Sequence, residues 1–120
     1  MNKNKTADLI IDAANDKILF KLISKDKTYT NEHENSRKNF DKFTILLIKF
    51  LTKKQYSFKK VRNVFINQGP GKYTSIRTSM ATIKALQLVY GFNYYGFNSD
   101  DITDGDYMKI LQLFKQKKLI

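Results

Sequence analysis

The stretch VRNVFINQGPGKYTSIR, residues 61–77, decides the fold. Its β-branched and aromatic opening predicts a strand at 61–67, and the glycines and proline of 68–71 predict a tight turn. A helix is expected from about Lys72 or Tyr73 to Tyr90, ended by Gly91 as a left-handed cap. Because strands joined by a helix crossover run parallel, the next strand, at 92–97, should lie parallel to this one.

Upstream of this unit the chain predicts three strands. Residues 7–14 (ADLIIDAA) and 17–24 (KILFKLIS) are apolar runs separated by a turn signal at Asn15-Asp16. After a second turn signal, residues 28–30 predict a short third strand at a sheet edge. We interpret the three as an antiparallel meander.

Two helices flank the crossover unit. Ser36 can cap a helix running to about Lys54, with Lys38, Lys42, Lys49 and Lys53 on one solvated stripe. After an acidic loop at 98–106, residues 107–118 predict an amphipathic helix with Met108, Leu111 and Phe114 or Leu119 inward. The order β-β-β-α-β-α-β-α indicates a single three-layer α/β domain.

Composition excludes several classes of protein. The 120 residues include no cysteine, which rules out disulfides, thiolate metal sites and cysteine nucleophiles. No apolar run has the ~20 residues of a membrane span, and no signal-peptide pattern is present, so we expect a cytoplasmic location. The net charge is +11, with 12 basic residues and one acid between residues 35 and 97. This indicates a basic face, and a basic RNA-binding module stays an alternative function.

The sequence offers few candidates for a catalytic, phosphate-binding or metal-binding site. Gly69-Pro70-Gly71 precedes a helix, where anions bind, but it matches neither phosphate-loop pattern, and a tight turn is the favoured interpretation. Asp12 at a strand end could hold a metal-bound phosphate in a small phosphotransferase, although a turn-capping role is favoured. His33, the single histidine, is expected on the surface, and the acidic run 100–106 lacks calcium-loop spacing. We expect no metal, no cofactor and no catalytic residue.

Both long helices are unusually apolar. In the first, apolar residues fill most of the circumference: Phe40, Phe43, Leu46, Leu47, Ile48, Phe50 and Leu51. The second carries an apolar face of Tyr73, Ile76, Met80, Ile83, Leu86 and Tyr90. Its other side has a stripe of small residues (Thr74, Thr78, Ala81, Ala85), and its only charges are Arg77 and Lys84. Such helices are expected to be covered, in part by another protein.

Residues 68–77 resemble the G-P-G-S-F-T-G-[LIV]-R signature of the TsaB (YeaZ-like) family. The family's opening I-D-T-S hairpin is matched in position by Ile11-Asp12-Ala13-Ala14, without the hydroxyl pair. The resemblance covers about residues 7–99, and the family usually carries a second lobe beyond this point. It assigns 1–99 to a TsaB-like N-terminal lobe, and 100–120 to an acidic loop and short helix of the same domain.

The resemblance implies an actin-like ATPase (ASKHA, ribonuclease H-like) lobe with a mixed sheet. It also implies a non-catalytic subunit that pairs helix-to-helix with a TsaD-like protein in threonylcarbamoyladenosine modification of tRNA. A TsaE-like ATPase would join, tRNA contact would be indirect, and a homodimer would form when the partner is absent. The candidate partner-binding residues are Phe40, Phe43, Thr74, Ile76, Arg77, Met80 and Ile83. The signature turn is Gly69, Pro70, Gly71, Tyr73 and Thr74.

Overall fold

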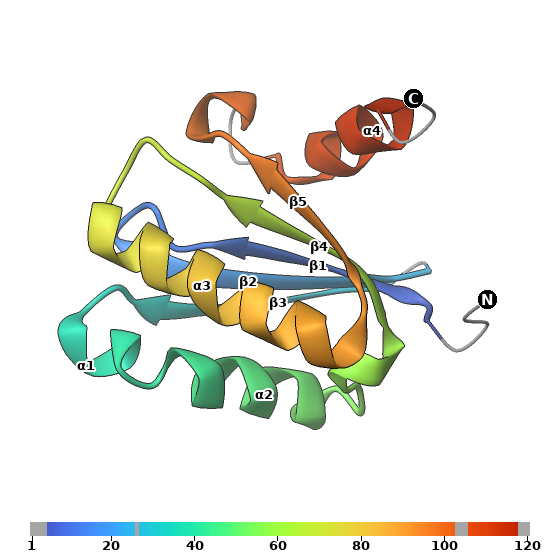
Figure 1. Ribbon diagram of the computed structural model, residues 1–120, viewed down its shortest axis with the longest axis horizontal. Coiled ribbons are helices and arrows are strands. Elements are labelled where there is room, and N and C mark those ends of the chain that lie inside the picture. The colour runs from blue at the N-terminus through green and yellow to red at the C-terminus, as the bar shows by residue number, and fades with distance from the viewer. Residues whose placement is uncertain (1–4, 26, 103–105, 118–120) are drawn as a thin grey trace.

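A five-stranded mixed sheet forms the middle of the molecule (Figure 1). The computed structural model describes residues 5–25, 27–102 and 106–117. The strand order is β3-β2-β1-β4-β5. The strands are β1 (Ala7–Asp12), β2 (Lys17–Ser24), β3 (Lys27–Glu34), β4 (Val61–Asn67) and β5 (Asn93–Phe97). The first three pair antiparallel, and β4 pairs parallel with β5, as the crossover argument predicts, and also with β1.

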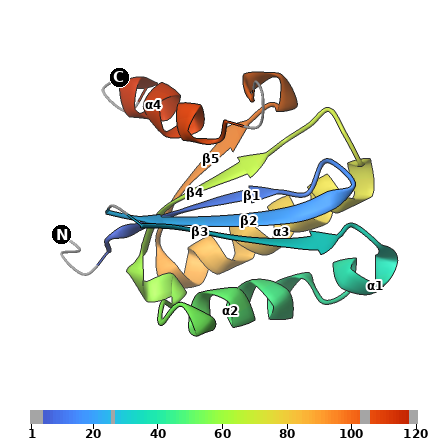
Figure 2. The ribbon, with the colours of Figure 1, turned by 180° about the vertical axis from the view of Figure 1, so that it is seen from behind.

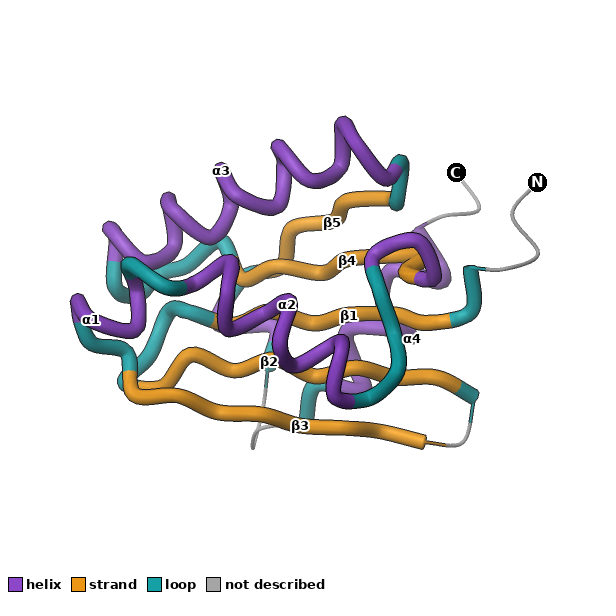
Figure 3. Tube along the Cα trace, turned by 90° about the horizontal axis from the view of Figure 1, so that it is seen from below, coloured by secondary structure: helices purple, strands orange, loops and turns teal. Residues whose placement is uncertain are grey.

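The helices lie on both faces of this sheet. They are α1 (Arg37–Phe40), α2 (Phe43–Lys53), α3 (Tyr73–Tyr90) and α4 (Met108–Lys117), with short 3₁₀ turns η1 (Phe58–Lys60) and η2 (Ser99–Asp101). Figures 2 and 3 show α2 and α3 on one face and α4 on the other. The predicted three-layer α/β architecture is therefore confirmed.

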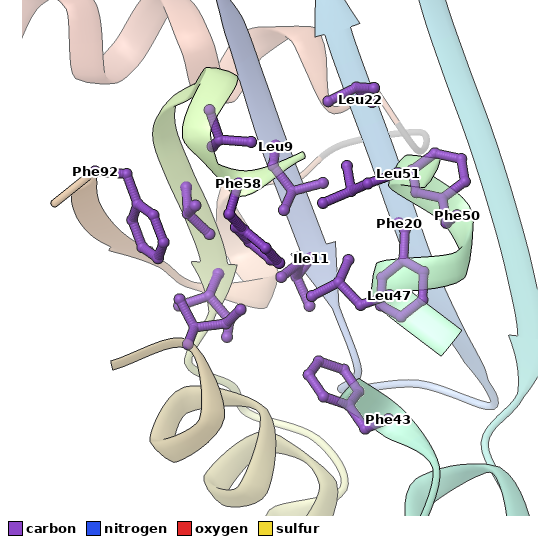
Figure 4. Close-up of a cluster of buried hydrophobic side chains, with 14 of the residues drawn as sticks. Leu9, Ile11, Phe20, Leu22, Phe43, Leu47, Phe50, Leu51, Phe58 and Phe92 are labelled. Carbon is purple, nitrogen blue, oxygen red and sulfur yellow. The ribbon is translucent and has the colours of Figure 1, made fainter. Parts of the chain in front are cut away.

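The larger core lies between the sheet and the α2–α3 layer (Figure 4). Phe20 of β2 is fully buried and meets Phe43 edge-on and Phe50 in a stack, at centroid separations of 5.6 and 6.0 Å. Burying a side chain of this size stabilises the fold by roughly 2–3 kcal/mol. Since all six residues of β1 are buried, this central strand is covered on both faces.

The smaller core lies under α4. It consists of Ile10, Ile23, Phe65, Phe97 and Ile110. The prediction for the last helix was partly wrong, because Met108 is 43% exposed and Ile110 is the buried residue. Leu111 does pack against this core, whereas the side chains of Phe114 and Leu119 lie outside those that the structure describes.

The third strand and the first predicted helix differ most from expectation. The third strand has eight residues rather than three, because every residue from Lys27 to Glu34 pairs with β2. The predicted helix 36–54 is divided in two, since the Lys42 N–H bonds the Asn39 carbonyl in a tighter turn. The break separates half-buried Phe40 from Phe43, which enters the core against Phe20. Ser36 caps α1 as predicted, its Oγ accepting the Asn39 N–H.

His33 is not the solvated residue that the sequence indicates. Its ring is half-buried and lies 6.0 Å from the ring of Phe20, and its Nε2 is buried with no hydrogen-bond partner in the described structure. The cause is the extension of β3, which places His33 opposite Ile18 on the core side of the sheet. Among the described residues no helix is both long and apolar enough to cross a membrane.

Substitution of Ile83 tests which face of α3 belongs to the core. Ile83 is fully buried, so Ile83→Asp places an unpaired carboxylate in the α3–sheet core and should unfold the chain. Ala85→Asp, on an exposed position two residues further on, should leave the melting temperature within a few degrees of the parent. Thermal unfolding followed by circular dichroism measures both. A folded Ile83→Asp variant would contradict this assignment.

Candidate functional site

The carboxyl ends of β1, β4 and β5 meet at one edge of the sheet, where open α/β sheets bind ligands. Three connections leave from this edge: the hairpin after Asp12, the turn at residues 68–72 and the segment after Phe97. Backbone hydrogen bonds join them, from the Lys72 N–H to the Ala14 carbonyl at 2.9 Å and from the Ser99 N–H to the Gly69 carbonyl at 2.8 Å. The edge is thus one connected unit.

Asp12 is the buried centre of this edge. It is 1% exposed, and both carboxylate oxygens accept hydrogen bonds. Oδ1 accepts from the Ala14 N–H at 3.0 Å and from Nδ2 of Asn67 at 3.1 Å, and Oδ2 accepts from the Tyr107 hydroxyl at 2.7 Å. Burying a carboxylate is costly unless such donors replace its water, so these three groups account for its burial.

Asn67 links this carboxylate to the signature turn. Its amide donates to Ser99 Oγ at 3.1 Å, and its Oδ1 accepts the Gly69 N–H at 2.7 Å. The Ser99 hydroxyl in turn donates to the Pro70 carbonyl at 2.7 Å. The turn glycines therefore serve the geometry of the chain, as expected: Gly69 has φ of +110°, and Gly71 packs directly against Ala14.

Tyr107 closes the network from the opposite layer. Burial, reinforced by its hydrogen bond to Asp12 and by the negative charges of Asp12 and Glu32, raises the pKa of the Tyr107 phenol above its usual value of about 10. The phenol is therefore a proton donor that holds α4 over the edge of the sheet. The hydrogen-bonding groups around Asp12 are thus paired with one another, so the arrangement serves the fold and does not present a set of free ligands.

A hollow of about 400 Å³ lies beside this edge, between α1 and the start of α3. Its lining comprises Asn35, Ser36, Arg37, Phe40, Asp41, Thr74 and Ser75. Ser75 Oγ donates to Asn35 Oδ1 at 2.9 Å, and the Asn35 amide donates to the carbonyls of Ala13 and Asn15. The side chains of Asn35 and Ser75 are thus paired with each other and with backbone carbonyls of the neighbouring hairpin.

The described residues contain no group of three or more histidine, aspartate or glutamate side chains able to hold a metal ion. In the described part of the acidic run 100–106, Asp101 accepts the Asn98 N–H at 2.9 Å, and Asp106 accepts the Met108 N–H at 3.1 Å. These carboxylates therefore cap η2 and α4; Asp104 lies outside the described residues.

The structure corrects the predicted partner-binding set. Phe43, Ile76 and Ile83 are 3%, 5% and 0% exposed, so these side chains belong to the chain's own core and are not available to a partner. Thr74 and Arg77 are exposed, and Phe40 and Met80 are half-buried, so their role stays a prediction. Tyr73, predicted on the apolar face, is 68% exposed under the Arg77 guanidinium, whose Nη1 donates to the Tyr73 hydroxyl.

Sequence reasoning missed three members of the Asp12 network and two exposed apolar residues. Asn67 ends a strand parallel to β1, so strand order alone could have paired it with Asp12; no local signal points to Ser99 or Tyr107. Leu88 and Val89 of α3 are 87% and 73% exposed. Helical periodicity could have predicted this exposure, because it places both residues away from the inward-facing stripe of α3.

Removal of the Tyr107 hydroxyl should weaken the fold. Tyr107→Phe leaves Asp12 buried with one donor fewer, a loss of about 1–3 kcal/mol in the free energy of unfolding. Because the phenol pKa is raised in the folded state, its stabilising contribution is complete below about pH 10 and falls as the pH rises further. Tyr107→Phe should therefore also reduce the alkaline loss of stability.

Urea unfolding at several pH values measures both effects. Tyr73→Phe is the control, since this exposed phenol pairs only with exposed Arg77 among the described residues. Equal losses in the two variants would contradict the Asp12 network.

Gly71 is predicted to be intolerant of any side chain. A Cβ there would collide with the backbone carbonyl of Ala14, so Gly71→Ala should cost about 1–3 kcal/mol of unfolding free energy. Gly91, by contrast, needs only its left-handed φ of +72°, and a Cβ there would meet only Lys5 Nζ, at an ordinary contact distance of 3.9 Å. Gly91→Asn should therefore be well tolerated. Denaturant unfolding compares the two, and a neutral Gly71→Ala would refute the close packing of hairpin and turn.

Comparison with known proteins gives structural likeness only. No protein-family model matches the sequence, and no curated protein is similar to it. YeaZ from Pseudomonas aeruginosa superposes with a TM-score of 0.71 at 13% identity, over 78% of this chain and 44% of that one. A second structure, of an uncharacterized protein with similarity to peptidase YeaZ from Pseudomonas aeruginosa, gives the same score and identity over 78% and 43%.

T. thermophilus RuvC, solved with a Holliday junction substrate, superposes with a TM-score of 0.56 at 7% identity, over 80% of this chain and 66% of that one. This chain spans less than half the length of the two YeaZ-type structures. It has the ribonuclease H-like fold, in the form that YeaZ shows over the matching part of its chain.

Proposed function

We propose that this chain is a partner subunit without chemistry of its own, which pairs through the α2–α3 layer with a TsaD-like protein in threonylcarbamoyladenosine modification of tRNA. The observation that carries the proposal is the uncovered outer face of α3. It exposes Thr74, Arg77, Ala81, Ala85 and Leu88 at helical spacing. Such a face on an eighteen-residue helix is suited to a second helix rather than to water.

The chemistry of this face favours close helix packing. Ala81 and Ala85 have small side chains, so a partner helix can approach at the short end of the usual 8–10 Å range. Beside them, a hollow of about 330 Å³ lined by Met80, Ala81, Lys84, Gln87 and Tyr94 can receive a partner's side chain. In the same layer, α2 exposes Ile45 and Ile48 by 54% and 45%.

The Asp12 network supports a subunit without catalysis. Both oxygens of its carboxylate are engaged by donors of this chain, and Ala13 and Ala14 supply no side-chain hydroxyl for a phosphate. A small phosphotransferase acting through Asp12 and the Gly69–Gly71 turn would need that carboxylate free. We therefore rank the nucleotide-binding alternative below the partner subunit. A TsaE-like ATPase would join the pair, and tRNA would be contacted chiefly through the partner.

Light scattering after size-exclusion chromatography tests the pairing. The chain, mixed with the TsaD-like protein of the same organism, should elute as a one-to-one complex at micromolar concentration. Ala81→Asp and Ala85→Asp should abolish it, because each places a charge in the centre of the interface. Thr30→Asp, an exposed change on β3, is the matched control and should leave the complex intact.

Circular dichroism on each variant separates loss of pairing from loss of fold. A wild-type chain that stays alone beside the TsaD-like protein would overturn the proposal. A self-associated chain that the TsaD-like protein converts to the one-to-one complex would agree with it.

A further inference from the structure

Charge is distributed unevenly between the two ends of the sheet. The carboxyl end of β1 holds many described acids, among them Asp16, Glu34, Asp41 and Asp101, together with lysines and an arginine. At the other end, which holds the start of β1, the only described acid is Asp8, and Arg62 pairs with it through two guanidinium nitrogens. A general excess of lysine in the sequence does not explain why the acids gather at one end.

Four exposed lysines gather at the acid-poor end: Lys25 and Lys27 at the β2–β3 turn, and Lys59 and Lys60 in η1. We call them, together with Tyr56, the basic end. The Thr6 N–H bonds the Lys60 carbonyl at 3.0 Å, and Ala7 lies opposite both Ser24 and Val61, so the two lysine pairs flank the start of β1 (Figure 1). A hollow of about 370 Å³ beside the first of these pairs is lined by Thr6, Ser24, Lys25, Lys27 and Tyr56.

Neighbouring lysines have structural roles within the chain, whereas of these four Lys60 alone has a side-chain contact among the described residues, with the ring of Tyr56. Lys5 donates from Nζ to the Tyr90 carbonyl at the end of α3, and Lys53 and Lys54 lie at the end of α2, where positive charge complements the helix dipole. No ion pair is found for Lys25, Lys27, Lys59 or Lys60 among the described residues. By sequence, Asp26 offsets one of these charges.

The acids of the opposite end do not neutralise them. The six residues of β1 span roughly 20 Å at 3.3 Å per residue, more than twice the ~8 Å screening length of physiological salt. The basic end therefore presents its positive potential to solvent and to any anion that approaches it.

We propose that the basic end is a docking surface for the phosphate backbone of a nucleic acid. Lysines on flexible stems at the rim of a hollow can follow a row of phosphates, and Tyr56 offers a half-buried ring at its wall, under the Lys60 ammonium. The single arginine nearby, Arg62, is committed to Asp8. The bidentate reading of guanine is therefore not available, and the docking is independent of base sequence.

This surface lies at the ends of the strands, whereas the proposed partner face is the outer side of α3, so the inference stands with or without a TsaD-like partner. Fluorescence anisotropy tests it on the full chain, with a labelled RNA hairpin and a DNA hairpin of the same sequence, from about 50 to about 250 mM salt. The test variant replaces Lys25, Lys27, Lys59 and Lys60 by glutamine.

The matched control replaces Lys17, Lys38, Lys42 and Lys49 by glutamine; these four are also exposed, and the change in net charge is the same. The test variant should bind at least about tenfold more weakly than the parent near 100 mM salt, with the log–log salt slope reduced by about 3, whereas the control keeps most of the affinity. Melting temperatures verify that both variants fold.

Equal weakening in the two variants would show binding by net charge alone and would overturn the proposal. Absence of hairpin binding by the parent would do the same. Poly-glutamate that binds the parent as tightly as RNA, and loses binding in the test variant, would assign the basic end to an acidic protein instead. Preference for the RNA or the DNA hairpin, with loss in the test variant, supports the proposal and identifies the nucleic acid.

Discussion

The buried carboxylate of Asp12 is the constraint on which the carboxyl edge of the sheet depends. A charge at this depth persists only because donors come from three parts of the chain: the hairpin backbone, the end of β4 and the first residue before α4. Through Asn67 and Ser99 the same bonds fix the glycine turn and therefore the point from which α3 starts. Both oxygens of this carboxylate are therefore engaged by donors of the chain itself.

The two layers that cover the sheet are unequal, and this bears on function. The α2–α3 layer buries a large aromatic and aliphatic core on its inner side while leaving apolar and small residues on its outer side. The α4 layer buries a smaller core and is held at its start by Tyr107. A helix such as α3, with Ile83 inward and Leu88 outward, has the character of an interior element, which is why we propose a protein partner for its outer face.

The basic end and the proposed partner face lie at different places on the molecule. The proposed partner face runs along α3, whereas the basic end lies where the strands β1 and β4 begin. Both α2 and α3 end near this region, and positive charge at a helix C-terminus complements the helix dipole. This explains the presence of some lysines in the region, but not of those at the β2–β3 turn and in η1. A chain of this shape can contact a protein on one side and a polyanion at another without competition between the two.

The sequence by itself determined the strands 17–24 and 61–67, the crossover helix and its Gly91 cap, because apolar periodicity and turn glycines are local properties of the chain. It underestimated β3, whose polar residues form a strand only by pairing with all of β2. It also placed His33 in solvent, and it left open which apolar residues of α3 face inward. Only the tertiary structure brought Tyr107 to Asp12 across 95 residues, and only it gathered the lysines of two distant turns at one end of the sheet. Such contacts depend on strand order and layer packing, which no local pattern encodes.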